Sequence, residues 1–118
     1  MLLAFSFAAA GARFVERQDL IVQEANAIGT AYLRADLLEE SQASELRSAL
    51  RRYTEHRVAL SRHLRNVLSA ADLEEVARLQ ARIWRAARAG VAARPGALVS
   101  VLPPVNELID LHATRMAP

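Results

Sequence analysis

Residues 1–38, MLLAFSFAAAGARFVERQDLIVQEANAIGTAYLRADLL, decide the fold that this sequence predicts. The first twelve residues carry no charge, and they continue into a charged but still largely apolar segment with only Gly11 at the join. Because no other helix-breaking residue interrupts the pattern, we expect one long helix from about Leu2 to Leu38. Its first part would be as apolar as a helix at membrane depth.

The remaining sequence also favours helices. Hydrophobic residues make up 53% of the 118-residue chain, while Gly and Pro contribute only four residues each. Apolar residues recur at spacings of three, four and seven, which is typical of amphipathic helices at about residues 42–67, 70–93 and 97–114. Short connections favour antiparallel neighbours. The sequence therefore predicts an all-α fold: a bundle of about four helices with a long N-terminal helix, largely antiparallel.

Local signals place the ends of these helices. Ser69 and Asp72 have the spacing of a capping box at the start of the third helix. Its expected core face consists of Leu73, Val76, Leu79, Ile83 and Ala87. Arg94-Pro95-Gly96 is a strong stop signal. In the fourth helix we expect Pro103-Pro104 to cause a kink or a restart, since proline cannot donate to the helical hydrogen bonds.

The uncharged N-terminus predicts contact with a membrane. Twelve residues are too few to span a bilayer, which needs about 20 apolar residues. Arg13 and Arg17 follow directly, as is typical of a cytoplasmic flank. We therefore expect residues 1–12 to be the truncated end of a transmembrane helix and residues 13–118 to be one cytoplasmic helical domain continuous with it. Two alternatives remain open: a secretory signal peptide and a helix buried in a soluble bundle.

Glu24 is the most unusual side chain of the first helix, because at 100° per residue it lies on an apolar face. A buried carboxylate needs a partner or a raised pKa. Arg17, two turns back, or an Arg or Asn from another helix could pair with it. The pairing would fix the helix register. An ion or proton site, and simple exposure at the bundle edge, are the alternatives.

Small and polar residues of the same helix suggest how it packs. Ala27, Ala31 and Ala35 recur every fourth residue and would let the fourth helix approach closely. Asn26, on another side, could donate to the face of the fourth helix that carries Asn106. Together these residues define a candidate buried polar network: Arg17, Glu24, Asn26, Asn106, Glu107 and Asp110.

No enzyme is predicted. The chain has no Cys, which excludes disulfides, thiolate metal sites and a cysteine nucleophile. It lacks a Glu-x-x-His motif and a Gly-rich phosphate loop. We therefore assign no catalytic, cofactor-binding or metal-binding residues. The residues whose oxygen ligands come nearest to a metal site are Glu107 and Asp110, which would suit a hard cation.

All 15 basic residues are Arg, yet the net charge is only +2. The third helix carries an Arg stripe, which we expect to face water or anionic lipid head groups; no nucleic-acid partner is predicted, because no nucleic-acid-binding signature accompanies it. The stripe consists of Arg78, Arg82, Arg85 and Arg88.

Two motifs resemble the bestrophin-like family of bacterial membrane proteins, whose function is unassigned. The first is Arg13-Phe14-Val15-Glu16-Arg17 followed by residues 24–34, EANAIGTAYLR; the second is residues 106–110, NELID. The resemblance covers nearly the whole chain. It implies two membrane spans at each end of the intact protein with a helical cytoplasmic part between them. This chain would supply the end of the second span and that cytoplasmic part.

The resemblance also implies a function. True bestrophins are pentameric anion channels with aromatic residues of the second span in the pore neck, upstream of an Arg-aromatic pair that Arg13-Phe14 resembles. On that basis Phe5 is a candidate pore-neck residue. The chain would be the cytoplasmic region of a homo-oligomeric, ion-channel-like protein in the bacterial cytoplasmic membrane, with residues 13–118 mainly on the cytoplasmic side. The ion substrate is left open. The alternative is a soluble helical-bundle module for protein interactions, with no transport role.

Overall fold

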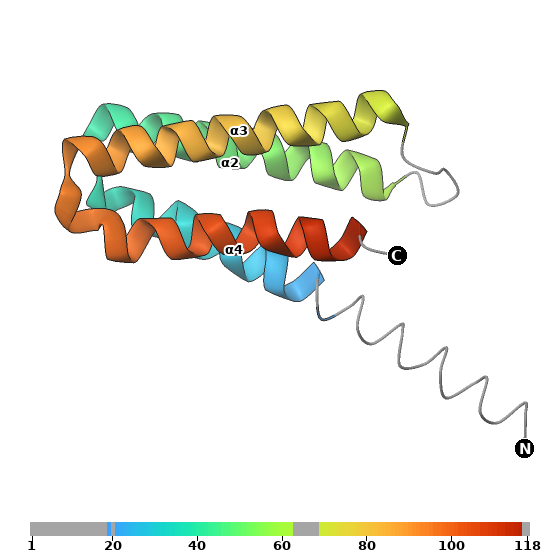
Figure 1. Cartoon of the computed structure of the whole chain (residues 1–118), viewed down its shortest axis with the longest axis horizontal. Helices are drawn as coiled ribbons and strands as arrows, with labels where there is room; N and C mark the ends of the chain where they lie inside the picture. Colours follow the sequence, from blue (N-terminus) through green and yellow to red (C-terminus); the bar gives the residue numbers. More distant parts are fainter. Residues whose placement is uncertain (1–18, 20, 63–68, 117–118) are drawn as a thin grey trace, which may run out of the picture.

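The computed structural model describes residues 19, 21–62 and 69–116, with side chains as far as Leu111. All regular structure in these residues is helical. A first helix, residues 21–34, is followed by η1 (Ala35–Leu37), α2 (Glu40–Ser61), α3 (Ala70–Ala93), η2 (Pro95–Ala97) and α4 (Leu98–Met116). The four long helices run alternately in opposite directions and pack against each other (Figure 1). The predicted all-α, largely antiparallel bundle of about four helices is confirmed.

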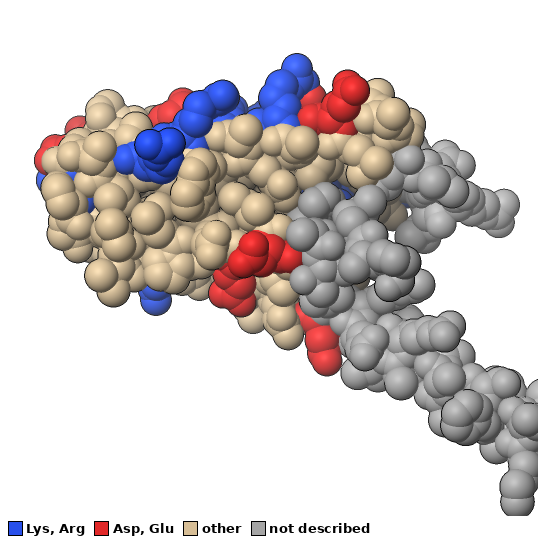
Figure 2. Space-filling view, viewed as in Figure 1, with Lys and Arg blue, Asp and Glu red and all other residues tan. Residues whose placement is uncertain are grey.

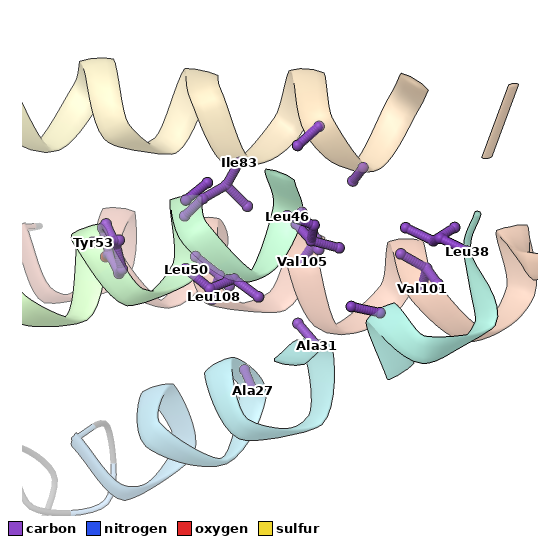
Figure 3. Packing of buried hydrophobic residues seen from close by; sticks show 14 of the residues in the cluster. Ala27, Ala31, Leu38, Leu46, Leu50, Tyr53, Ile83, Val101, Val105 and Leu108 are labelled. Carbon is purple, nitrogen blue, oxygen red and sulfur yellow. The ribbon is translucent and has the colours of Figure 1, made fainter. Parts of the chain in front are cut away.

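The core lies along the axis between the helices. Tyr53 of α2, Ile83 of α3 and Leu108 of α4 are all fully buried and converge there (Figure 3). Burying one such side chain stabilises the fold by roughly 1.5–3 kcal/mol. The large, fully buried side chains are Tyr53, Leu46, Leu50, Ile83, Leu108, Val76, Val101 and Val105. Each long helix beyond the first contributes at least two of them, so the core depends on all three.

The first helix joins this core through small residues. Ala27, Ala31 and Ala35 are all buried, at 3%, 0% and 0% exposure, as the spacing of four predicted. Ala27 and Ala31 point from this helix into the bundle (Figure 3). Ala27 shares a groove with Pro103 and Pro104 of α4, which supports the predicted approach of the fourth helix.

The ends of α3 follow the predicted signals. The Ser69 side chain accepts a hydrogen bond from the Asp72 backbone, and the Asp72 side chain accepts one from the Ser69 backbone, both at 3.1 Å. The predicted capping box is thus present. At the other end, the Arg94 side chain donates to the Leu37 carbonyl at 2.9 Å and to Glu39 at 2.7 Å. This one arginine ties the α3–η2 junction to the start of α2.

Gly90 lets the same end of the bundle close tightly. A Cβ atom at Gly90 would lie 2.5 Å from Leu38 Cδ1, and Leu38 is itself buried. The methyl groups of Leu38 therefore occupy the space that a side chain at position 90 would need. This contact holds α3 against the segment between η1 and α2.

Two details differ from the sequence predictions. Leu73, expected in the core face of α3, is 37% exposed. It lies in the first turn of α3, at one end of that helix. The helix predicted to reach about Val67 ends at Ser61, and residues 63–68 lie outside the described residues.

The N-terminal predictions are not addressed by the described residues. Residues 1–12, Phe5 and Arg17 all lie outside them. Among the helices that are described, none combines the length and the apolar character needed to cross a membrane.

Pro103 and Pro104 do not make the fourth helix restart, since α4 continues from Leu98 to Met116. The two prolines lie near its N-terminus, so the missing N–H groups leave only the carbonyls of Val99 and Ser100 without their helical donors. Arg34 of the first helix donates to the Ser100 carbonyl at 3.0 Å. A side chain from a neighbouring helix thus replaces the donor that Pro104 lacks.

We therefore expect Arg34→Met to lower the free energy of unfolding by about 0.5–1 kcal/mol, because the Ser100 carbonyl loses its donor. In a Pro104→Ala background, where residue 104 has its own N–H group, the same change should cost clearly less. Urea unfolding of the four proteins gives the coupling as a double-mutant cycle. Equal costs in both backgrounds would show that Arg34 does not compensate for the proline.

Candidate functional site

The most unusual group in the described structure is the buried carboxylate of Glu24, in the first helix, which is 5% exposed. Two side chains from α2 reach it. Arg57 Nε donates to Glu24 Oε1 at 3.1 Å, and the Tyr53 hydroxyl donates to the same oxygen at 3.4 Å. Tyr53 and Arg57 are four residues apart and so lie on one face of α2. Among the partners that the sequence left open for Glu24, an Arg from another helix is observed, while Arg17 lies outside the described residues.

The ion pair is buried, and its burial affects the pKa of the neighbouring Tyr53. The Glu24 and Arg57 side chains are only 6% and 13% exposed, so both are largely removed from water. Burial and the nearby Glu24 charge raise the pKa of Tyr53, while Gln80 and Arg57 act in the opposite direction. The hydroxyl of Tyr53 therefore keeps its proton over a wide pH range and remains a donor to Glu24.

Gln80 of α3 and His56 of α2 add two further polar groups near this layer of the core. The Gln80 amide is close enough to Tyr53 to affect its pKa, although its Nε2 atom makes no hydrogen bond of good geometry. His56 Nε2 is also buried, and no hydrogen bond joins it to another described residue. These atoms make the middle of the bundle more polar than the sequence pattern predicts.

A groove of about 560 Å³ opens beside the ion pair, between the first helix and the second half of α2. Glu24 and Arg57 are its charged lining residues. The other lining residues are mostly apolar or small: Ile21, Ala25, Ile28, Gly29, Thr54, Val58, Leu60 and Ser61. A pocket of this size falls in the range of about 300–1,000 Å³ that is typical of small-molecule sites.

A second, more polar groove of about 320 Å³ lies between the first helix and α4. Asn26 and Glu107, two members of the predicted polar network, both line it, together with Arg34. Asn26, Asn106, Glu107 and Asp110 are exposed, whereas Glu24 is buried on the side that faces α2. The described members of the predicted network thus occupy two different places.

Sequence reasoning missed Arg57 and the role of Tyr53 beside Glu24. The apolar spacing of residues 42–67 places Tyr53 on the same helix face as Leu46 and Leu50, so it was expected only as a core residue, and Arg57 was not singled out. A signal was present: Arg57 follows Tyr53 by one helical turn, which places an arginine on the buried face of an amphipathic helix. Such a residue needs a buried anion, and Glu24 was already predicted to need a cation.

The charged surface shows how the Arg stripe is used. Arg82 donates to Glu45 at 2.9 Å and to the Ser48 hydroxyl at 3.1 Å, and Arg78 pairs with Glu75. Basic atoms follow the upper edge of the bundle with acidic atoms beside them, and further acidic atoms lie on the lower side (Figure 2). Two of the four arginines of the stripe are thus paired: Arg82 joins α3 to α2, and Arg78 pairs with a residue one turn away in α3. In the described part of the chain, no three His, Asp or Glu residues are grouped as a metal site would need.

The buried pair predicts a non-additive effect on stability. Arg57→Met should lower the free energy of unfolding by roughly 3 kcal/mol, because it removes the cation from beside a buried carboxylate. The double variant Glu24→Met/Arg57→Met should be much less destabilised, because no buried charge remains without its partner. Chemical denaturation of both proteins and of the wild type measures this. A double variant at least as unstable as the single one would contradict the proposed pairing.

The raised pKa of Tyr53 predicts that the protein loses stability in alkaline solution. Because folding raises the pKa of this acid, its contribution is fully present below the unfolded pKa of about 10 and is lost as pH rises through the higher folded value. Thermal melts from pH 9 to pH 11 should show a steeper loss for the wild type than for Tyr53→Phe. The control Tyr32→Phe, which retains Tyr53, should follow the wild type. Parallel wild-type and Tyr53→Phe profiles would refute this.

Comparison with known proteins does not identify the chain. Its two grooves and its buried ion pair therefore have to be interpreted from their own geometry. No protein-family model, no curated protein and no solved structure matches the sequence or its fold.

Proposed function

We propose that this chain is the non-enzymatic helical region of a bestrophin-like integral membrane protein. In this proposal residues 1–12 belong to a membrane helix, and the bundle assembles the cytoplasmic part of the protein. The intact protein would be a homo-oligomer that conducts ions, as the resemblance of Phe5 and Arg13-Phe14 to a pore neck implies. The uncharged N-terminal residues and the motif at residues 24–34 support the proposal.

The observation that carries the proposal is that residues 24–34, which form the family-like motif, make contacts with the other helices of the bundle. Glu24 binds Arg57 of α2, and Arg34 binds the Ser100 carbonyl of α4. Tyr32 accepts a hydrogen bond from Arg51 of α2 at 3.1 Å. Ala27 and Ala31 are buried in the core. The family-like residues therefore hold helices together, which is the role expected of an assembly motif rather than of a catalytic one.

One observation favours the alternative of a protein-interaction module. Ile21, Val22 and Val58 are 46%, 54% and 46% exposed, and Ile21 and Val58 line the groove beside Glu24. Exposed apolar residues that line a groove are typical of binding surfaces. Under this alternative the groove would take a partner and the chain would have no transport role.

Membrane association separates the two functions. We expect the full chain, expressed in bacteria, to stay in the membrane pellet after an alkaline carbonate wash. The variant Phe5→Arg/Ala9→Arg should move to the soluble fraction, because two charges make the N-terminal segment too costly to insert. The matched control Leu33→Arg/Val99→Arg places the same charges at bundle positions that are 73% and 77% exposed, and it should behave like the wild type.

A wild-type chain that is recovered as a soluble, folded monomer would overturn the membrane proposal and favour the interaction module. Extraction of the Leu33→Arg/Val99→Arg control would also count against it, because retention would then not depend on residues 1–12.

A further inference from the structure

We propose that the groove between the first helix and α2 binds a free medium-chain fatty acid, with its alkyl chain along the apolar walls and its carboxylate at Arg57. This inference goes beyond the proposed function, and it holds for either of the two functions considered above. It follows from the residues that line the groove, from the hydrogen bonds that their polar groups already make and from the charge of Arg57.

The walls are built for an elongated apolar ligand. Ile21, Ala25 and Ile28 lie on one face of the first helix, and Val58 and Leu60 line the opposite side from α2. Gly29 extends the groove, because a Cβ atom placed there would meet nothing within 4 Å. From Ile21 to Gly29 the helix rises by about 12 Å, at 1.5 Å per residue. The groove is therefore long, and the wall formed by the first helix has no side chain at Gly29.

The hydroxyl groups on the walls are already satisfied. Thr54 Oγ1 donates to the Leu50 carbonyl at 2.8 Å, and Ser61 Oγ donates to the Val58 carbonyl at 2.7 Å. Both bonds stay within α2. A sugar or a nucleotide would place many hydroxyl groups against these walls without partners, which is costly. An alkyl chain makes no such demand.

Arg57 is the lining residue with donors to spare. Its guanidinium carries five N–H groups in a planar fork. Its Nε atom binds Glu24, and no other hydrogen bond joins Arg57 to the described residues. The two terminal nitrogens form a separate edge of the fork, so Arg57 can hold Glu24 on one edge and a second carboxylate on the other.

Glu24 limits how strongly the head group contributes. Its negative charge offsets part of the Arg57 charge, and it would repel a second carboxylate nearby. Most of the affinity should therefore come from the buried chain, and the carboxylate should mainly select the orientation and the head-group type. A cationic head group would be repelled by the guanidinium, and Glu24 Oε1 already accepts hydrogen bonds from Arg57 and Tyr53, so an amine should bind more weakly than a carboxylate.

Titration calorimetry of the full chain with octanoate and decanoate tests the chain-length effect. We expect saturable binding of one ligand per chain. Affinity should rise about fourfold for each added methylene until the groove is filled, which corresponds to about 0.8 kcal/mol per buried CH₂. Decanol should bind several-fold more weakly than decanoate, and decylamine at least tenfold more weakly. Equal affinities for decanoate and decylamine would overturn the role of Arg57.

A matched pair of variants locates the site. Gly29→Leu fills the open wall of the groove and should reduce decanoate affinity at least tenfold while the variant still melts cooperatively. Ala81→Leu adds the same side chain at an exposed position of α3, away from the groove, and should bind as the wild type does. Unchanged binding by Gly29→Leu, weakened binding by Ala81→Leu, or no saturable binding by the wild type would each refute the proposal.

Discussion

The ion pair between Glu24 and Arg57 sets how the first helix lies on α2. Small side chains alone specify register weakly, because Ala27 and Ala31 could slide along an apolar surface at little cost. A buried carboxylate cannot slide away from its guanidinium without a large electrostatic penalty. The pair therefore selects one alignment among several that burial alone would permit, and Tyr53 reinforces it by donating to the same oxygen.

Arginine performs a similar task at several other points of the bundle. Arg34 supplies the donor missing from Pro104, Arg82 links α3 to α2, and Arg94 holds two chain turns together. In each case a planar guanidinium reaches across a gap between elements and satisfies an oxygen that the local backbone does not. All 15 basic residues of the chain are Arg, so many guanidinium groups can form hydrogen bonds between neighbouring elements.

The fold was largely predictable because its signals are local. Helical spacing, the Ser69–Asp72 capping box and the stop at Arg94-Pro95 depend on neighbouring residues, and the structure confirms them. The site was less predictable, because it depends on which helices meet. Burial of Glu24 followed from its apolar surroundings, but the choice of Arg57 as its partner depends on the packing of α2. The exposed positions of Asn26, Asn106 and Asp110 depend likewise on how α4 is rotated, which spacing does not specify.

The two ends of the bundle are packed differently, and this difference affects where the structure opens locally. At one end Leu38 fills the space beside Gly90, and Arg94 ties the two chain turns there. At the other end Ile21 and Val58 remain exposed beside the groove. Local opening starts where few apolar contacts must be broken. Backbone amides should therefore exchange with solvent along a gradient, fastest in the first turns of residues 21–34 and slowest near Ile83 and Val101.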